Sequence, residues 1–215
     1  MYVRGLSGKA LSTGYTTILM GEENRAFVTD AANDYESMWA YGHDLLGGSF
    51  NYTVDVSNVG CACAAGAFFV DLNDEECSWN AKDEDVTPQC ASIEIMEANI
   101  YGFNVASNPC EFGSCDIVSQ CRASITTDSD VGGTEVYGYG SGYSIDTSMP
   151  YKVSTKFWAN QDVDGMAIDL AYIETILEQE DRVVTMMMDC PEYLESMTWK
   201  LYSGFNFGMS TYNLE

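Results

Sequence analysis

Alternating apolar and polar residues are the feature that most constrains the fold of this chain. From Phe50 to Val56 every second residue is apolar, and the residues between them are polar. Successive side chains of a strand point to opposite faces of a sheet, so this alternation predicts a half-buried strand. Similar segments predict further strands at Gly66–Leu72, Ala91–Ile100, Tyr151–Trp158, Met166–Ile173, Arg182–Met188 and Phe205–Tyr212. Many strands joined by loops indicate an all-β sandwich of two antiparallel sheets.

One segment has helical spacing instead. Its apolar residues Leu194, Met197 and Leu201 recur every three or four positions after Asp189, which can cap a helix. We therefore predict one short helix. Ile173–Glu180 also contains helix-forming residues, and its own sequence leaves helix and strand both open.

Length and charge restrict the organisation and the partners. The chain has 215 residues, which predicts a single domain spanning residues 1–215. Nine Lys and Arg stand against 33 Asp and Glu, for a net charge of -24. Such a surface repels phosphate backbones and anionic lipids, so we expect neither nucleic acid nor a membrane as a partner. No apolar stretch approaches the roughly 18–20 residues that span a bilayer.

The cysteines indicate disulfide bonds. The chain has eight cysteines, no Cys-x-x-Cys pair and a single histidine, His43. A structural zinc site therefore lacks its usual ligands, and we expect no metal and no cofactor. Disulfides imply an oxidising compartment, so we expect a secreted or cell-surface protein.

The segment Ser92–Glu97 can place two carboxylates on one face of a strand. Ser92 and Glu94 share a face by alternation, and a one-residue bulge before Glu97 would return its side chain to that face. Paired carboxylates are the groups that glycoside hydrolysis requires. In an acidic protein, an isolated Glu-x-x-Glu motif is more often only part of the surface charge. Whether this motif indicates catalysis therefore depends on the rest of the sequence.

Several ordered segments together resemble glycoside hydrolase family 7, the cellobiohydrolases and endoglucanases. They are Phe50–Asn58 with Cys61 and Phe68–Val70, Glu97–Asn99 with Asn108–Cys110, Tyr139–Pro150 with Thr155 and Phe157, and Gly208–Tyr212. The resemblance implies a curved, concanavalin-like β-jelly-roll whose concave face binds β-1,4-glucan, with retaining hydrolysis as the family activity. It also implies that Ile173–Val184 is a strand hairpin.

The catalytic motif departs from that of the family, which is Glu-x-Asp-x-x-Glu. The resemblance places Ser92 at the nucleophile, Glu94 at the middle Asp and Glu97 at the acid/base, so only Glu97 is unchanged. A serine hydroxyl without an activating base cannot replace a carboxylate as the glycosyl acceptor. The extra methylene of Glu94 allows it to reach towards the vacated position, although angstrom-scale misplacement can cost about 100-fold in rate.

Positions near the catalytic motif also differ from the residues that the family has there. By the resemblance, Asn108 stands where the family has its active-site histidine, Ala64 where it has an asparagine, and Phe68 where it has a tyrosine. Phe68, Asn108 and Tyr212 are the candidate substrate-binding residues. Phe68 and Tyr212 can equally be ordinary sheet aromatics.

The resemblance also implies disulfides. The implied pairs are Cys77 with Cys90, Cys110 with Cys115, and Cys121 with Cys190. Cys61 and Cys63 remain, and they can form a strained bridge with each other or bond to another chain. Asn51-Tyr52-Thr53 fits the glycan acceptor pattern.

These features lead to two functional hypotheses. The first is a secreted, cellulase-like pseudoenzyme that serves as an extracellular structural or assembly subunit or as a glycan-binding module. Its partners would be a β-glucan-type polysaccharide or copies of itself, in a homo-oligomer or filament. The second is an active endo-β-1,4-glucanase-type glycosidase that uses Glu97 as acid/base together with Glu94.

Overall fold

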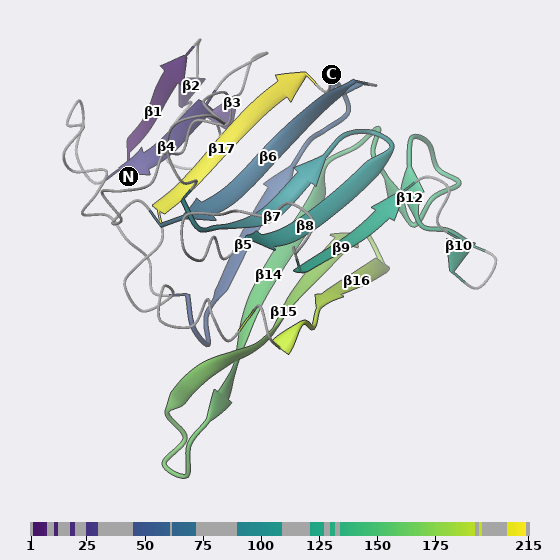
Figure 1. Ribbon diagram of the computed structural model, residues 1–215. Helices are drawn as coiled ribbons and strands as arrows, with labels where there is room; N and C mark the ends of the chain where they lie inside the picture. Colours follow the sequence, from purple (N-terminus) through teal and green to yellow (C-terminus); the bar gives the residue numbers. More distant parts are fainter. Residues whose placement is uncertain are drawn as a thin grey trace.

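Two antiparallel sheets packed face to face dominate the architecture (Figure 1). The computed structural model describes residues 2–7, 11–12, 18–19, 25–29, 45–60, 62–71, 90–108, 121–126, 130–131, 134–191, 194 and 206–213. Within these residues, no helix has the length and apolar character needed to cross a membrane.

The larger sheet has seven strands in the order β1-β4-β17-β6-β7-β8-β9, all antiparallel to their neighbours. Their bounds are β1 Tyr2–Ser7, β4 Arg25–Thr29, β17 Asn206–Asn213, β6 Cys63–Val70, β7 Ser92–Ala98, β8 Gly102–Asn108 and β9 Cys121–Thr126. Strand β17, from the end of the chain, lies between β4 and β6 (Figure 1). The sheet therefore depends on pairing between segments that are far apart in the sequence.

The smaller sheet has four strands in the order β16-β15-β14-β5. Their bounds are β16 Arg182–Met188, β15 Ala167–Gln179, β14 Tyr151–Gln161 and β5 Ser49–Val54. The β14–β15 hairpin is the longest pairing of the fold, and its tip projects beyond the sheet (Figure 1). Three short pairs complete the strands: β2 Leu11–Ser12 with β3 Ile18–Leu19, β10 Asp130–Val131 with β11 Thr134–Glu135, and β12 Tyr137–Gly138 with β13 Ile145–Asp146.

Aromatic rings fill the space between the two sheets. Phe69 of β6 is fully buried and meets Phe50 edge to face, with ring centroids 5.2 Å apart. Its centroid also lies 5.4 Å from that of Phe207 and 6.1 Å from that of Phe157. These rings come from β5, β6, β14 and β17, so the core joins both sheets. Full burial of one such side chain contributes about 1.5–3 kcal/mol.

The two-sheet all-β fold confirms the prediction made from alternation. Arg182–Met188 is a strand with the predicted bounds, and Ile173–Gln179 belongs to β15, as the hairpin interpretation required. Strands β1, β4, β8 and β9 of the larger sheet were not predicted, and β8 and β9 contain few large apolar residues. Most of the predicted helix lies outside the described residues; within them, the Leu194 N–H donates to the Cys190 carbonyl at 3.1 Å.

A buried carboxylate orders the loop that follows β13. Oδ1 of Asp146 accepts hydrogen bonds from Gly140 N–H at 2.8 Å, Ser148 N–H at 2.9 Å and Ser148 Oγ at 2.6 Å. The side chain of Gln179 bonds to both backbone groups of Asp146, which fastens the loop to β15. Burial opposes ionisation, but the bonds from Ser148 and Gly140 and the Arg182 charge hold the pKa of Asp146 below its ordinary value of 3.8.

Replacement of Asp146 by asparagine is expected to lower the free energy of unfolding at pH 7 by about 1–2 kcal/mol, because hydrogen bonds to a charged acceptor become neutral ones. A depressed carboxyl pKa stabilises the fold above the unfolded-state pKa, and this stabilisation is lost as the pH falls through the folded-state pKa. The difference in the free energy of unfolding between the wild type and Asp146→Asn, measured with urea, should therefore be smaller near pH 3 than at pH 7. Asp162→Asn, at an exposed turn, is the matched control. An equal loss in both variants would contradict the prediction.

Candidate functional site

A β-bulge in β7 brings the two glutamates of the candidate site to one face of the seven-stranded sheet. Glu94 lies opposite Phe68 of β6 and Ala106 of β8, and Glu97 lies opposite Gly66 and Asn104. Three steps along β7 therefore match two steps along each neighbouring strand, which is the bulge that the sequence predicted. Between the glutamates, Ile95 and Met96 are both buried in the core. The glutamates consequently face away from the core.

Ser92, Glu94 and Asn108 form a hydrogen-bonded group on that face. Asn108 lies directly opposite Ser92 in the β7–β8 register. Its Nδ2 donates to Ser92 Oγ at 3.2 Å and to Glu94 Oε1 at 3.4 Å. Ser92 is 8% exposed and Asn108 9% exposed. The position predicted for the nucleophile therefore holds a buried hydroxyl bonded to an amide.

Glu94 titrates near neutral pH, well above the ordinary range of a carboxyl group. Burial, and to a smaller extent the negative charge of Glu97, raise the pKa of Glu94 from 4.5 to about 7, against the opposing effects of Arg122 and the Asn108 hydrogen bond. Arg122 lies on β9, opposite Ala106, which is itself opposite Glu94. Arg122 was not predicted from the sequence, because the unpredicted strands β8 and β9 have to pair before it comes near Glu94.

Phe68 and Tyr212 are the two aromatic residues predicted to bind sugar, and the structure describes the side chain of Phe68 only. Phe68 lies on the same face as Glu94, but only 4% of its surface is exposed. It therefore presents almost no ring surface to a ligand in this conformation. Tyr212 lies on β17 opposite Ala64, and its side chain is outside the described part of the structure.

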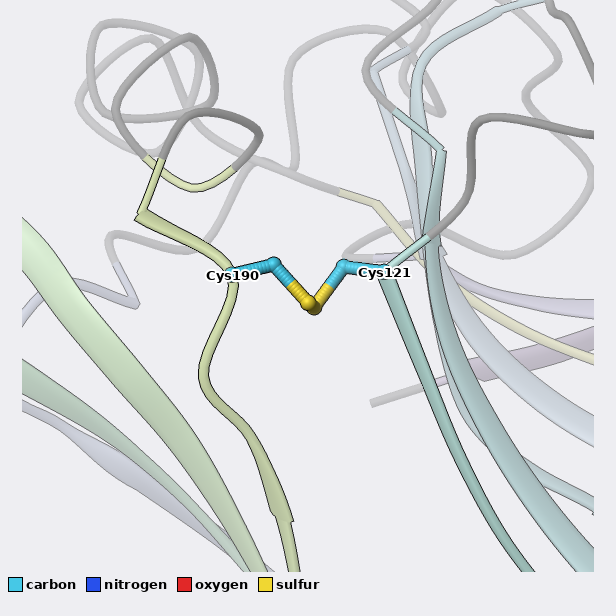
Figure 2. The surroundings of a disulfide bond; sticks show 2 residues. All are labelled: Cys121 and Cys190. Carbon is cyan, nitrogen blue, oxygen red and sulfur yellow. A yellow bond between two sulfur atoms is a disulfide. The ribbon is translucent and has the colours of Figure 1, made fainter.

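The disulfide between Cys121 and Cys190 joins the two sheets (Figure 2). Cys121 begins β9, at one edge of the larger sheet, and Cys190 follows β16, at one edge of the smaller sheet. This is the pair that the family resemblance implied. Cys90 is also disulfide-bonded, and the partner expected for it, Cys77, lies outside the described residues.

The remaining predicted positions are only partly described. Cys61, Cys110 and Cys115 lie outside the described residues. Cys63 is half-buried at the start of β6, and its carbonyl accepts a hydrogen bond from Asn99 Nδ2 at 3.2 Å. Asn51 of the glycan acceptor pattern is exposed on β5, an edge strand of the smaller sheet.

Comparison with known proteins agrees with this architecture. No family model matches the sequence. Among solved structures, a mutant of the Humicola insolens endocellulase Cel7B has a TM-score of 0.67 and 18% identity, covering 89% of this chain and 61% of that one. A family 7 cellobiohydrolase from Daphnia pulex has a TM-score of 0.62 and 15% sequence identity, and the match covers 98% of this chain and 65% of that one. The chain has the fold of the glycoside hydrolase family 7 cellulases.

A third similar structure contains a bound oligosaccharide. The Melanocarpus albomyces cellobiohydrolase, complexed with cellotetraose, gives a TM-score of 0.61 at 15% identity, covering 97% of this chain and 64% of that one. This chain thus spans less than two thirds of the length of these cellulases. At such identities the likeness establishes the fold alone.

Proposed function

We propose that this chain is a secreted pseudoenzyme with a cellulase fold, which does not hydrolyse glucan and serves as an extracellular structural or assembly subunit. The observation that carries the proposal is the Ser92–Asn108–Glu94 group. Retaining hydrolysis needs a carboxylate that attacks the sugar and a second one that protonates the leaving group. Ser92 offers a hydroxyl, and the hydrogen bond that its Oγ accepts comes from the Asn108 amide rather than from a base.

Burial around the same group supports a structural role over glucan binding. Ser92, Asn108 and Phe68 are each less than 10% exposed, so they offer a sugar few accessible polar groups and little ring surface. The Melanocarpus cellobiohydrolase was solved with cellotetraose, which makes that oligosaccharide the natural probe for a retained binding groove. Calorimetric titration with cellotetraose distinguishes the two roles, and measurable binding would favour the glycan-binding form of the proposal.

The test of the proposal is a turnover assay on a soluble β-1,4-glucan. We expect no hydrolysis by the wild type. Ser92→Glu combined with Glu94→Asp rebuilds the carboxylate frame of the family, and hydrolysis gained by this variant would identify the missing carboxylate as the cause of inactivity. Wild-type hydrolysis that Glu97→Gln abolishes would overturn the proposal.

A specific observation favours the alternative of an active glycosidase. Glu94, with a pKa of about 7, is within the range in which a carboxyl can act as a general acid or base near neutral pH. In that mechanism Glu97 protonates the leaving group, and ionised Glu94 activates water or attacks the sugar. The pH–rate profile would then show a step near pH 7 from the titration of Glu94, and Glu94→Gln would remove the activity. A profile without a step near pH 7, or activity retained by Glu94→Gln, excludes this role.

Secretion is part of the proposal and is supported by the covalent chemistry of the chain. The Cys121–Cys190 disulfide persists in oxidising compartments. Asn51 is exposed on an edge strand, where an attached glycan would extend into solvent.

A further inference from the structure

Strand β16 has a hydrogen-bonding edge to which no strand is paired in the described part of the chain. Strand β16 is the last strand of the four-stranded sheet, and its register with β15 runs without interruption from Arg182 to Met188. In the described part of the chain, no further strand continues the sheet beyond β16. Alternate backbone N–H and C=O groups along this edge therefore point away from the sheet.

The sequence of β16 lacks the features that usually protect an edge strand. Soluble proteins block such edges with charged residues, proline or bulges. Strand β16 reads Arg-Val-Val-Thr-Met-Met-Met, with a single charge at its first residue and no bulge. Met186 and Met188 are buried in the core, whereas Val183 is 60% exposed and Met187 49% exposed. The strand is thus anchored on one face, and on the other it exposes Val183, Thr185 and Met187, none of which is charged.

The open edge at β5 differs in chemistry. Its solvent-facing residues Ser49, Asn51 and Thr53 are polar, and Asn51 lies in a glycan acceptor pattern. A glycan there would obstruct a neighbouring strand. Strand β16 is therefore the better candidate for pairing with another chain.

We propose that β16 pairs with β16 of a second copy of this chain, antiparallel, about a two-fold axis at Thr185. In this register Val183 of one copy lies opposite Met187 of the other, and the two Thr185 side chains lie opposite each other. Apolar pairs and Thr–Thr pairs are both favourable across antiparallel strands. A two-fold pairing closes on itself and gives a dimer.

The charge distribution favours this strand as the meeting point of two acidic chains. Each copy carries a net charge of -24, so most approaches bring carboxylates together. Between Asp181 and Asp189 the strand contains no acidic residue. In the paired register these two aspartates of opposite copies face each other at the ends of the ladder. The dimer should therefore weaken at low ionic strength, where repulsion is less screened.

Sedimentation velocity over a range of protein concentrations tests the proposal. The wild type should show a monomer–dimer equilibrium. Val183→Lys with Met187→Lys places like charges opposite each other and should raise the dissociation constant at least roughly tenfold. Val183→Lys with Met187→Glu places the introduced lysine of one copy opposite the introduced glutamate of the other, and should dimerise more tightly than the double-lysine variant.

The control is Val163→Lys with Met166→Lys, which adds the same charge at exposed positions of the β14–β15 hairpin, away from β16. It should dimerise as the wild type does. Amide hydrogen exchange of the wild type provides a readout without substitution, because protection of residues 182–188 should rise with protein concentration. A monomer at all concentrations, or a dimer that neither β16 variant affects, would overturn the proposal. The assay does not depend on hydrolysis, so its failure would leave the proposed loss of catalysis untouched.

Discussion

Replacing both Cys121 and Cys190 by alanine is expected to lower the free energy of unfolding by about 4 kcal/mol. The bond spans a sequence separation of 69 residues, and a cross-link of this span removes a large amount of conformational entropy from the unfolded chain. It also connects the β9 edge of one sheet to the end of β16 in the other. For a chain of this size the loss corresponds to a melting temperature lower by roughly 10 °C.

Thermal and urea unfolding of the single and double variants provide the measurement. Each single variant removes the same bond, so the double variant should lose about as much stability as either single one. This non-additivity separates the disulfide from the packing of the two side chains. Additive losses would show that side-chain packing, rather than the bond, accounts for the effect.

Replacing Glu94 by glutamine is expected to stabilise the protein at pH 8 by up to about 3 kcal/mol. Burial, reinforced by Glu97, raises the pKa of Glu94 to about 7, so the folded state binds a proton more tightly than the unfolded state between about pH 4.5 and pH 7. The free energy of unfolding of the wild type therefore falls as the pH rises through this range. Glutamine is neutral throughout and lacks this penalty.

The Glu94→Gln variant also offers a new hydrogen bond. Oδ1 of Asn108 is buried and has no partner among the described residues, and the introduced amide can donate to it. Between pH 4.5 and pH 8, the free energy of unfolding of the variant should increase relative to that of the wild type as the pH rises. Glu178→Gln, at an exposed position of β15, should show no such trend. A constant difference across the range would exclude a titrating Glu94 as the cause.

Much of the fold was predictable because its signals are local. Alternation depends on residues two apart, and it identified strands such as Arg182–Met188 without knowledge of their partners. The bulge before Glu97 was likewise predicted from the spacing of two carboxylates. Strands β8 and β9 were missed because their small polar residues give a weak local signal, and they are stabilised mainly by their neighbours in the sheet.

The residues of the candidate site were predictable from the sequence, but their burial, hydrogen bonding and protonation were not. The serine at position 92 and the glutamates at 94 and 97 are written in the sequence, and with them the absence of a carboxylate at the first position. Tertiary structure decided that Asn108 bonds to both Ser92 and Glu94, that Phe68 is buried, and that Arg122 approaches from β9. A pKa near 7 requires desolvation and nearby charges, and both come from residues distant in the chain. The sequence by itself determined which groups are present, whereas packing decided whether they are charged, bonded or accessible.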